Sequence, residues 1–145
     1  MKFKALLLIL IFGFLLRVVG LSKIPAGFTW DEAALGYNAY SLLQTGKDEH
    51  GKFMPLIFKS FGDFKPGLYI YFTVLPVKLL GLSEFSTRLP SAVFGTLSIL
   101  LIYLLTRKIF NKNIALSSIL LFTVNPTMIS FSRASWESNL NLFLL

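Results

Sequence analysis

Three long apolar segments, separated by polar stretches, dominate the pattern of this chain. They lie at about residues 3–21, 88–106 and 113–132, and the third has twenty residues without a charge. Because an α-helix rises 1.5 Å per residue, about twenty apolar residues match the roughly 30 Å hydrocarbon layer of a membrane. The pattern therefore predicts an all-α, polytopic membrane protein. We expect Asn125-Pro126 to kink or end the third span, since proline lacks an N–H.

The first and last apolar segments of the sequence indicate whether it is one part of a larger membrane protein. The first segment has the basic start and short apolar core of a signal peptide, but no small-residue cleavage site follows it, which favours a span. An apolar run from about residue 140 predicts the start of a further span. We therefore expect residues 1–145 to be the N-terminal part of one larger transmembrane domain.

Between the first two spans, residues 22–87 form a long polar-rich region. It contains two predicted helices, at about 31–44 and 66–80. The second is apolar but has only twelve uncharged residues before Lys78, with Pro76 among them, which is short for a span. We expect both helices to lie along the membrane surface, within one outer loop.

The distribution of basic residues supports this topology. If residues 66–80 do not cross the membrane, Arg107, Lys108 and Lys112 join Lys2 and Lys4 on the cytoplasmic side, as the positive-inside rule requires. All seven carboxylates then lie on the outer side.

Composition narrows the class further. With 54% hydrophobic and 14% charged residues and a mean hydropathy of +0.69, the chain is too apolar for an ordinary soluble domain. The net charge is +7, but the bases are dispersed, so nothing points to nucleic acid as a partner. The absence of cysteine excludes disulfides and thiolate metal sites.

The first candidate for chemistry follows the first span. Thr29 to Glu32 matches a capping box, with Thr29 as N-cap and Glu32 three residues later. On one interpretation Asp31 and Glu32 only stabilise a helix N-terminus. On the other, Glu32 folds back onto Thr29 and leaves Asp31 with a free carboxylate that can act as a general base.

Lys65 is the second candidate. It precedes Pro66 and would lie beside free N–H groups of Gly67 and Leu68 at a helix start, a favourable place for a phosphate. The alternative is a lysine that extends towards lipid headgroups.

Arg133 and Glu137, four residues apart after the third span, form the third candidate. They are either a local ion pair or, facing Asp31, part of a substrate or metal site. The acids and the histidine at 48–50 have poor spacing for a metal, and we expect a solvated loop there.

Together these residues resemble a known family. The motifs in order are Trp30-Asp31-Glu32-Ala33, Gly36-Tyr37-Asn38-Ala39-Tyr40-Ser41-Leu42-Leu43, Gly46-Lys47-Asp48-Glu49, Phe61-Gly62-Asp63-Phe64-Lys65-Pro66, Leu68-Tyr69 and Ser86-Thr87-Arg88-Leu89-Pro90-Ser91. The combination resembles the N-terminal part of bacterial family 39 glycosyltransferases, relatives of the protein O-mannosyltransferases and of the lipid A aminoarabinose transferase. The resemblance implies the C-type glycosyltransferase fold, with juxtamembrane helices on the outer face.

The resemblance also implies roles for particular residues. Asp31 and Glu32 match the acidic motif of the active site, Lys65 matches the lysine that contacts the lipid phosphate, and Glu137 matches an acid near the site in some members. Arg133, Asp63 and Tyr37 are expected in the vicinity of substrate or metal.

One position departs from the aminoarabinose transferase, which has a metal-linked glutamate just before its lysine. Phe64 stands there in this chain and Asp63 is one step away. No cofactor is therefore assigned, and a divalent metal ion stays an open alternative.

The implied activity is an inverting transfer of a sugar from a polyprenyl-phosphate donor to a hydroxyl of a protein, lipid or glycan, on the outer face of the cell membrane. We expect residues 1–145 alone to be inactive. The competing hypothesis is a transporter or flippase with an acidic outer solute site, which predicts charged or glycine-broken spans. Residues 89–106 of the second predicted span and the whole of the third contain no charge.

Overall fold

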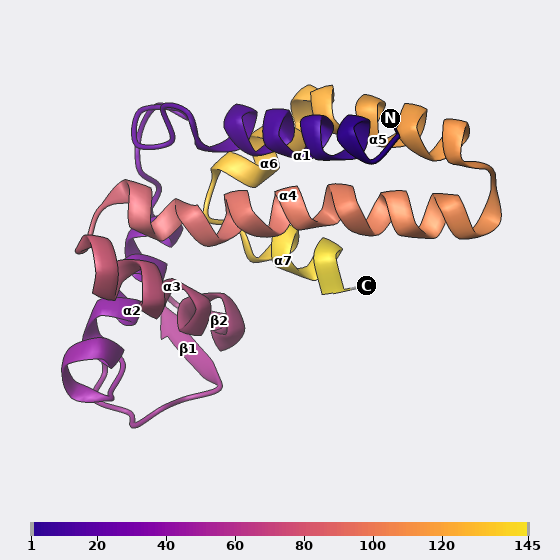
Figure 1. The fold of residues 1–145 in the computed structure, drawn as a ribbon. Coiled ribbons are helices and arrows are strands. Elements are labelled where there is room, and N and C mark those ends of the chain that lie inside the picture. Colours follow the sequence, from indigo (N-terminus) through magenta and orange to yellow (C-terminus); the bar gives the residue numbers. More distant parts are fainter. Residues whose placement is uncertain (1, 145) are drawn as a thin grey trace. The chain divides into compact units, whose positions relative to one another are not determined.

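The computed structural model describes residues 2–144, which form seven helices and one β-hairpin (Figure 1). The elements are α1 (Lys2–Val18), α2 (Trp30–Thr45), β1 (Ile57–Ser60), β2 (Asp63–Pro66), α3 (Gly67–Leu80), α4 (Glu84–Ile109), α5 (Lys112–Val124), α6 (Pro126–Arg133) and α7 (Glu137–Leu144). They belong to two compact units, Met1–Val19 with Ser91–Leu145, and Gly20–Pro90.

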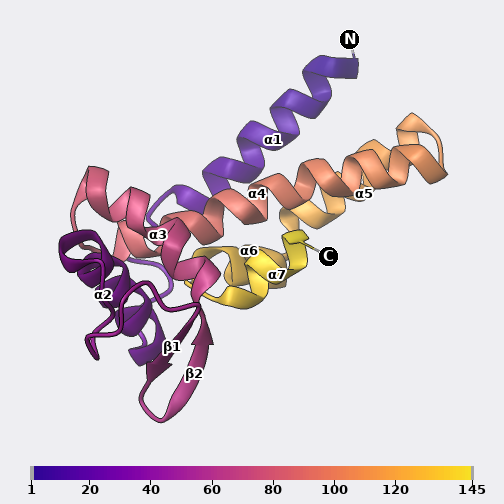
Figure 2. The same cartoon turned by 90° about the horizontal axis from the view of Figure 1, so that it is seen from below.

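In the first unit α1 packs on α5 and α4 runs beside α5, while α1 diverges from α4 in the view of Figure 2 (Figures 1 and 2). Its core consists of Ile99 and Tyr103 from α4 with Ala115 and Ile119 from α5, and α1 packs against this cluster. The approach of the helices is close at Gly13, where an added Cβ would lie 2.5 Å from the Cδ1 atom of Ile99.

The helix boundaries differ from those of the predicted spans. The helix α1 has 17 residues and ends at Val18 instead of 21, since the chain turns at Gly20 with φ 67°. The helix α4 begins at Glu84 instead of 88, because Ser83 and Ser86 cap its start by exchanging N–H···Oγ bonds of 3.0 and 3.2 Å. Within the described residues, α4 is the one unbroken helix long and apolar enough to cross a membrane.

The third predicted span is broken. Helices α5 and α6 meet at an angle of 59°, and together they would make one bent span. The Asn125 Oδ1 atom accepts hydrogen bonds from the N–H groups of Thr127 and Met128, and Pro126 opens α6. The predicted kink at Asn125-Pro126 is confirmed. A polytopic topology with three spans and a fourth beginning at 140 stays a prediction.

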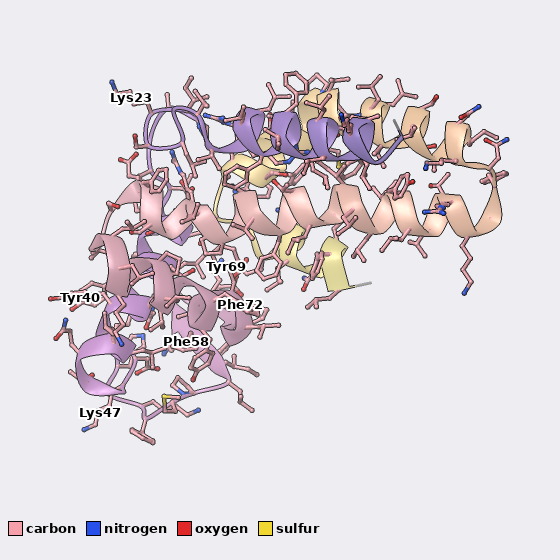
Figure 3. All side chains as sticks on the ribbon, viewed as in Figure 1. Lys23, Tyr40, Lys47, Phe58, Tyr69 and Phe72 are labelled. Atoms are coloured by element: carbon pink, nitrogen blue, oxygen red, sulfur yellow. The ribbon has the colours of Figure 1, made fainter. Side chains whose placement is uncertain are left out.

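The second unit packs α2 on α3 beside the hairpin. Its buried apolar residues include Leu35, Phe58, Tyr69 and Ile70, and Figure 3 shows Phe58 and Tyr69 inside this unit while Lys47 projects outward. The two helices lie close to the predicted ranges of 31–44 and 66–80, and their place at a membrane surface stays a prediction.

The hairpin corrects the expectation of an all-α fold. Strands β1 and β2 pair antiparallel from Ile57↔Pro66 to Ser60↔Asp63, and Phe61 and Gly62 connect them with φ values of 46° and 85°. Two positive φ values in a two-residue loop match the turn that suits the twist of a hairpin. The strands are only four residues long, and of the two only β1 alternates between exposed and buried positions, so the pattern was too brief to distinguish from a loop.

Candidate active site

The carboxylate of Asp31 and the ammonium of Lys65 form an ion pair. The Nζ atom of Lys65 lies 2.9 Å from Oδ1 of Asp31, and the side chains are 12% and 64% exposed. The pairing of Lys65 with Phe58 in the hairpin places the lysine on β2, whereas Asp31 is in the first turn of α2. The sequence-based hypothesis that Asp31 has a free carboxylate is therefore wrong for this state, because the hairpin brings a cation to it.

Asp63 adds a second acid to this pair. Its Oδ2 atom lies 3.8 Å from Nζ of Lys65, and its Oδ1 atom accepts a 2.7 Å hydrogen bond from the N–H of Phe64. Two carboxylates thus contact one ammonium, and these three side chains together carry one negative charge in excess.

This arrangement does not fit a divalent metal. Asp31 and Asp63 are the acids at hand, both are directed to an ammonium that repels a metal ion, and the apolar side chain of Phe64 supplies no ligand. Among the residues that the structure describes, no group of three or more His, Asp or Glu side chains is arranged to hold a metal.

The predicted phosphate-binding N–H groups are only partly available. The N–H of Gly67 donates a 2.9 Å hydrogen bond to the carbonyl of Leu56, so it is not free. The backbones are close here, since a Cβ on Gly67 would lie 2.7 Å from that carbonyl oxygen. That Lys65 binds a phosphate stays a prediction, and the N–H of Gly67 does not contribute to it in this structure.

Glu32 has a different environment from its neighbour Asp31. It is 1% exposed, and its two oxygens accept hydrogen bonds of 2.8 and 3.0 Å from Nε and Nη2 of Arg88. Its Oε2 atom also accepts from the N–H of Thr29, and the Thr29 side chain accepts from the N–H of Glu32. The predicted capping box is confirmed, and it is joined to a buried ion pair that the sequence did not reveal.

Arg88 is the important residue that sequence reasoning missed as part of the site. It is fully buried in the second turn of α4, and its guanidinium lies 5.5 Å from the ring centre of Phe28. The available signal was an arginine at the start of a long apolar helix, because a charge in such a place requires a compensating partner.

Tyr37 lies on the exposed side of α2. It is half exposed and borders a hollow of about 290 Å³ together with Phe28, Leu82 and Glu84. Phe28 also borders a second, open hollow of about 380 Å³ beside Asp31. Phe28 thus borders both hollows, the one beside Tyr37 and the one beside Asp31.

Arg133 and Glu137 belong to the other unit. The buried guanidinium of Arg133 donates hydrogen bonds of 2.7 and 2.8 Å to the carbonyls of Leu16 and Val19, and so it caps the end of α1. Glu137 is the first residue of α7 and is partly buried. That they face Asp31 stays a prediction.

The loop at 48–50 is more ordered than a solvated turn. Asp48 is 6% exposed and accepts hydrogen bonds from the N–H groups of His50 and Lys52, while Glu49 and Asn38 exchange two hydrogen bonds. The expectation of a solvated loop is wrong for Asp48, because a carboxylate that closes a tight turn is shielded by it.

Comparison with known families identifies the chain. A model for the family of dolichyl-phosphate-mannose-protein mannosyltransferases matches residues 65–145, more than half of the sequence. The chain belongs to this family. The match confirms the resemblance to family 39 glycosyltransferases, and the family is one of membrane-integral glycosyltransferases. No curated protein and no solved structure matched this chain.

Lys65 is the first residue of the family match, and Asp31 precedes it. The assignment of Lys65 thus lies within the matched segment, and that of Asp31 rests on its motif and on its contact with Lys65.

Proposed function

We propose that this protein transfers a sugar from a polyprenyl-phosphate donor to an acceptor hydroxyl on the outer face of the membrane. The observation that carries the proposal is the 2.9 Å contact between Asp31 and Lys65, which places a candidate base beside a candidate phosphate-binding cation. Membership of the mannosyltransferase family supports the same reaction class.

The reaction is a single displacement at the anomeric carbon. The carboxylate of Asp31 accepts the proton of the acceptor hydroxyl as the hydroxyl oxygen bonds to that carbon. The bond from the carbon to the phosphate oxygen breaks, and polyprenyl phosphate departs with the electron pair. Lys65 stabilises the charge that develops on the phosphate, and the configuration at the anomeric carbon inverts.

The helix that follows Lys65 supports a lipid-linked donor. Four large apolar residues on α3 are between 45% and 70% exposed, namely Leu68, Phe72, Leu75 and Leu79. Their spacing of three or four residues places them on one face of the helix. An apolar face that starts next to a phosphate-binding lysine suits a substrate with a charged head and a prenyl chain.

The test compares two aspartates that contact the same ammonium. In the complete enzyme, Asp31→Asn should reduce the single-turnover transfer rate about 10²- to 10⁴-fold, the usual effect of losing a general base. Asp63→Asn removes a charge at 3.8 Å from the same Nζ atom and should transfer at close to the wild-type rate. Near-normal transfer by Asp31→Asn would leave that residue with a helix-capping role and would contradict the mechanism.

A further inference from the structure

We propose that Arg88 is a positioning residue for Asp31, acting through Glu32 and through the loop that precedes α2. This inference rests on the proposed function, since it assumes that Asp31 is the base. It assigns to the second acid of the motif the task of holding the first in place.

The hydrogen bonds of Arg88 account for every donor that it has. A guanidinium carries five N–H donors in a planar fork. Nε donates to Oε1 of Glu32, and Nη2 donates to Oε2 of Glu32 and to the carbonyl of Gly27 at 2.6 Å. Nη1 donates to the carbonyls of Leu21 and Pro25, both at 3.1 Å. One buried side chain therefore fixes three points of the loop and the first turn of α2.

These contacts hold the backbone on both sides of Asp31. Glu32 is the next residue, and its Oε2 atom also accepts from the N–H of Thr29 at 3.1 Å. The chain from Thr29 to Glu32 is thus tied to Arg88, while the side chain of Asp31 remains 64% exposed and directed to Lys65. The position of the carboxylate is set by a neighbour that is itself shielded from solvent.

Lys65 is held by a different set of contacts. It is part of β2, and its strand is fixed by pairing with β1. Loss of the Arg88 contacts should therefore displace Asp31 and leave the phosphate-binding lysine in place. The expected signature is a slower chemical step without any loss of donor affinity.

Lysine cannot replace Arg88, because an ammonium has three donors and no planar fork. In the complete enzyme, Arg88→Lys should lower the single-turnover rate at saturating polyprenyl-phosphate sugar about 10- to 100-fold, as expected for a misplaced catalytic group. The rate is expressed per donor-binding site, so that unfolded protein does not contribute. Donor affinity should not fall below that of the wild type, because Lys65 stays in place and only loses its contact with Asp31.

Two glutamates next to Arg88 provide a matched pair. Glu32→Gln should reproduce the slower transfer. If Arg88→Lys does not fold, this variant tests by itself whether the contact between Arg88 and Glu32 positions Asp31. Glu84→Gln is the control, because Glu84 is 43% exposed and lies 3.8 Å from Nη1 without sharing the fork. Equal rates for the two glutamine variants would overturn the inference.

A double variant separates positioning from general loosening. If Arg88 acts through Asp31, adding Arg88→Lys to Asp31→Asn should cause no further loss. Losses that multiply would show that Arg88 affects the rate independently of Asp31 and would overturn the inference. Normal transfer by Asp31→Asn alone contradicts the proposed function, whereas a slow Asp31→Asn with a fully active Arg88→Lys contradicts only the role of Arg88.

Discussion

The carboxylate of Asp31 lies 2.9 Å from the ammonium of Lys65, so on the proposed function a donor phosphate that binds Lys65 competes with this carboxylate. We expect donor binding to weaken the contact and to make Asp31 available to the acceptor hydroxyl. The Asp31–Lys65 contact therefore predicts an order of events, in which the donor binds to Lys65 before Asp31 can act as a base.

This competition predicts that Asp31→Asn binds the donor more tightly although it fails to transfer the sugar. The Asp31 carboxylate is 64% exposed, and an ion pair open to solvent contributes about 0.2–1 kcal/mol, so donor affinity should rise by up to about fivefold. The measurement is equilibrium binding of a polyprenyl-phosphate sugar to the complete enzyme. Asp63→Asn, with its longer 3.8 Å contact, should show a smaller gain. Weaker binding by Asp31→Asn would show that the two residues do not compete for one position.

Lys65→Ala should weaken donor binding about 10- to 100-fold, because a hydrogen bond to a charged group contributes about 1.5–3 kcal/mol. Transfer should slow as well, since the leaving phosphate loses its cation. Lys65→Arg should recover only part of both, because a planar fork does not replace a compact ammonium. Lys59→Ala is the matched control, an exposed lysine on the other strand of the same hairpin. If both alanine variants bind the donor equally, Lys65 only anchors the protein to a lipid surface.

Gly36→Ala should destabilise the second unit. A Cβ at this position would lie 2.5 Å from Oγ1 of the buried Thr87, so this side chain or the start of α4 would have to shift. Overpacking of this kind costs about 1–3 kcal/mol and should lower the thermal unfolding midpoint in detergent. Adding Thr87→Ala removes the obstructing atoms and should raise the midpoint of the double variant above that of Gly36→Ala. An unchanged midpoint for the single variant would contradict this close packing.

The predicted topology places Lys52 outside and Lys108 inside the cell. Both are exposed, and the chain has no cysteine, so single cysteines at these positions can be compared directly. In intact cells an impermeant thiol reagent should label the variant at 52, and the variant at 108 should react only after permeabilisation. Equal labelling of both in intact cells would refute the outer location of the site.

The sequence alone determined the features that depend on near neighbours. The capping box of Thr29 and Glu32 joins groups three residues apart, and the break at Asn125 depends on side-chain bonds to the next two or three N–H groups. Such contacts form within one helical turn, so the order of residue types is sufficient to predict them. The apolar segments likewise predicted helices, although the observed helix boundaries differ from the predicted ones where a capping residue or a turn is present.

The tertiary structure decided which groups meet. Glu32 and Arg88 are 56 residues apart, and no local pattern distinguishes an acid that will pair with a buried arginine from one that will face solvent. The two adjacent acids point to different partners because the first turn of α2 is set between the start of α4 on one side and the hairpin on the other. The hairpin itself was hidden, since four-residue strands gain their stability from the helices beside them and carry too short a pattern of their own.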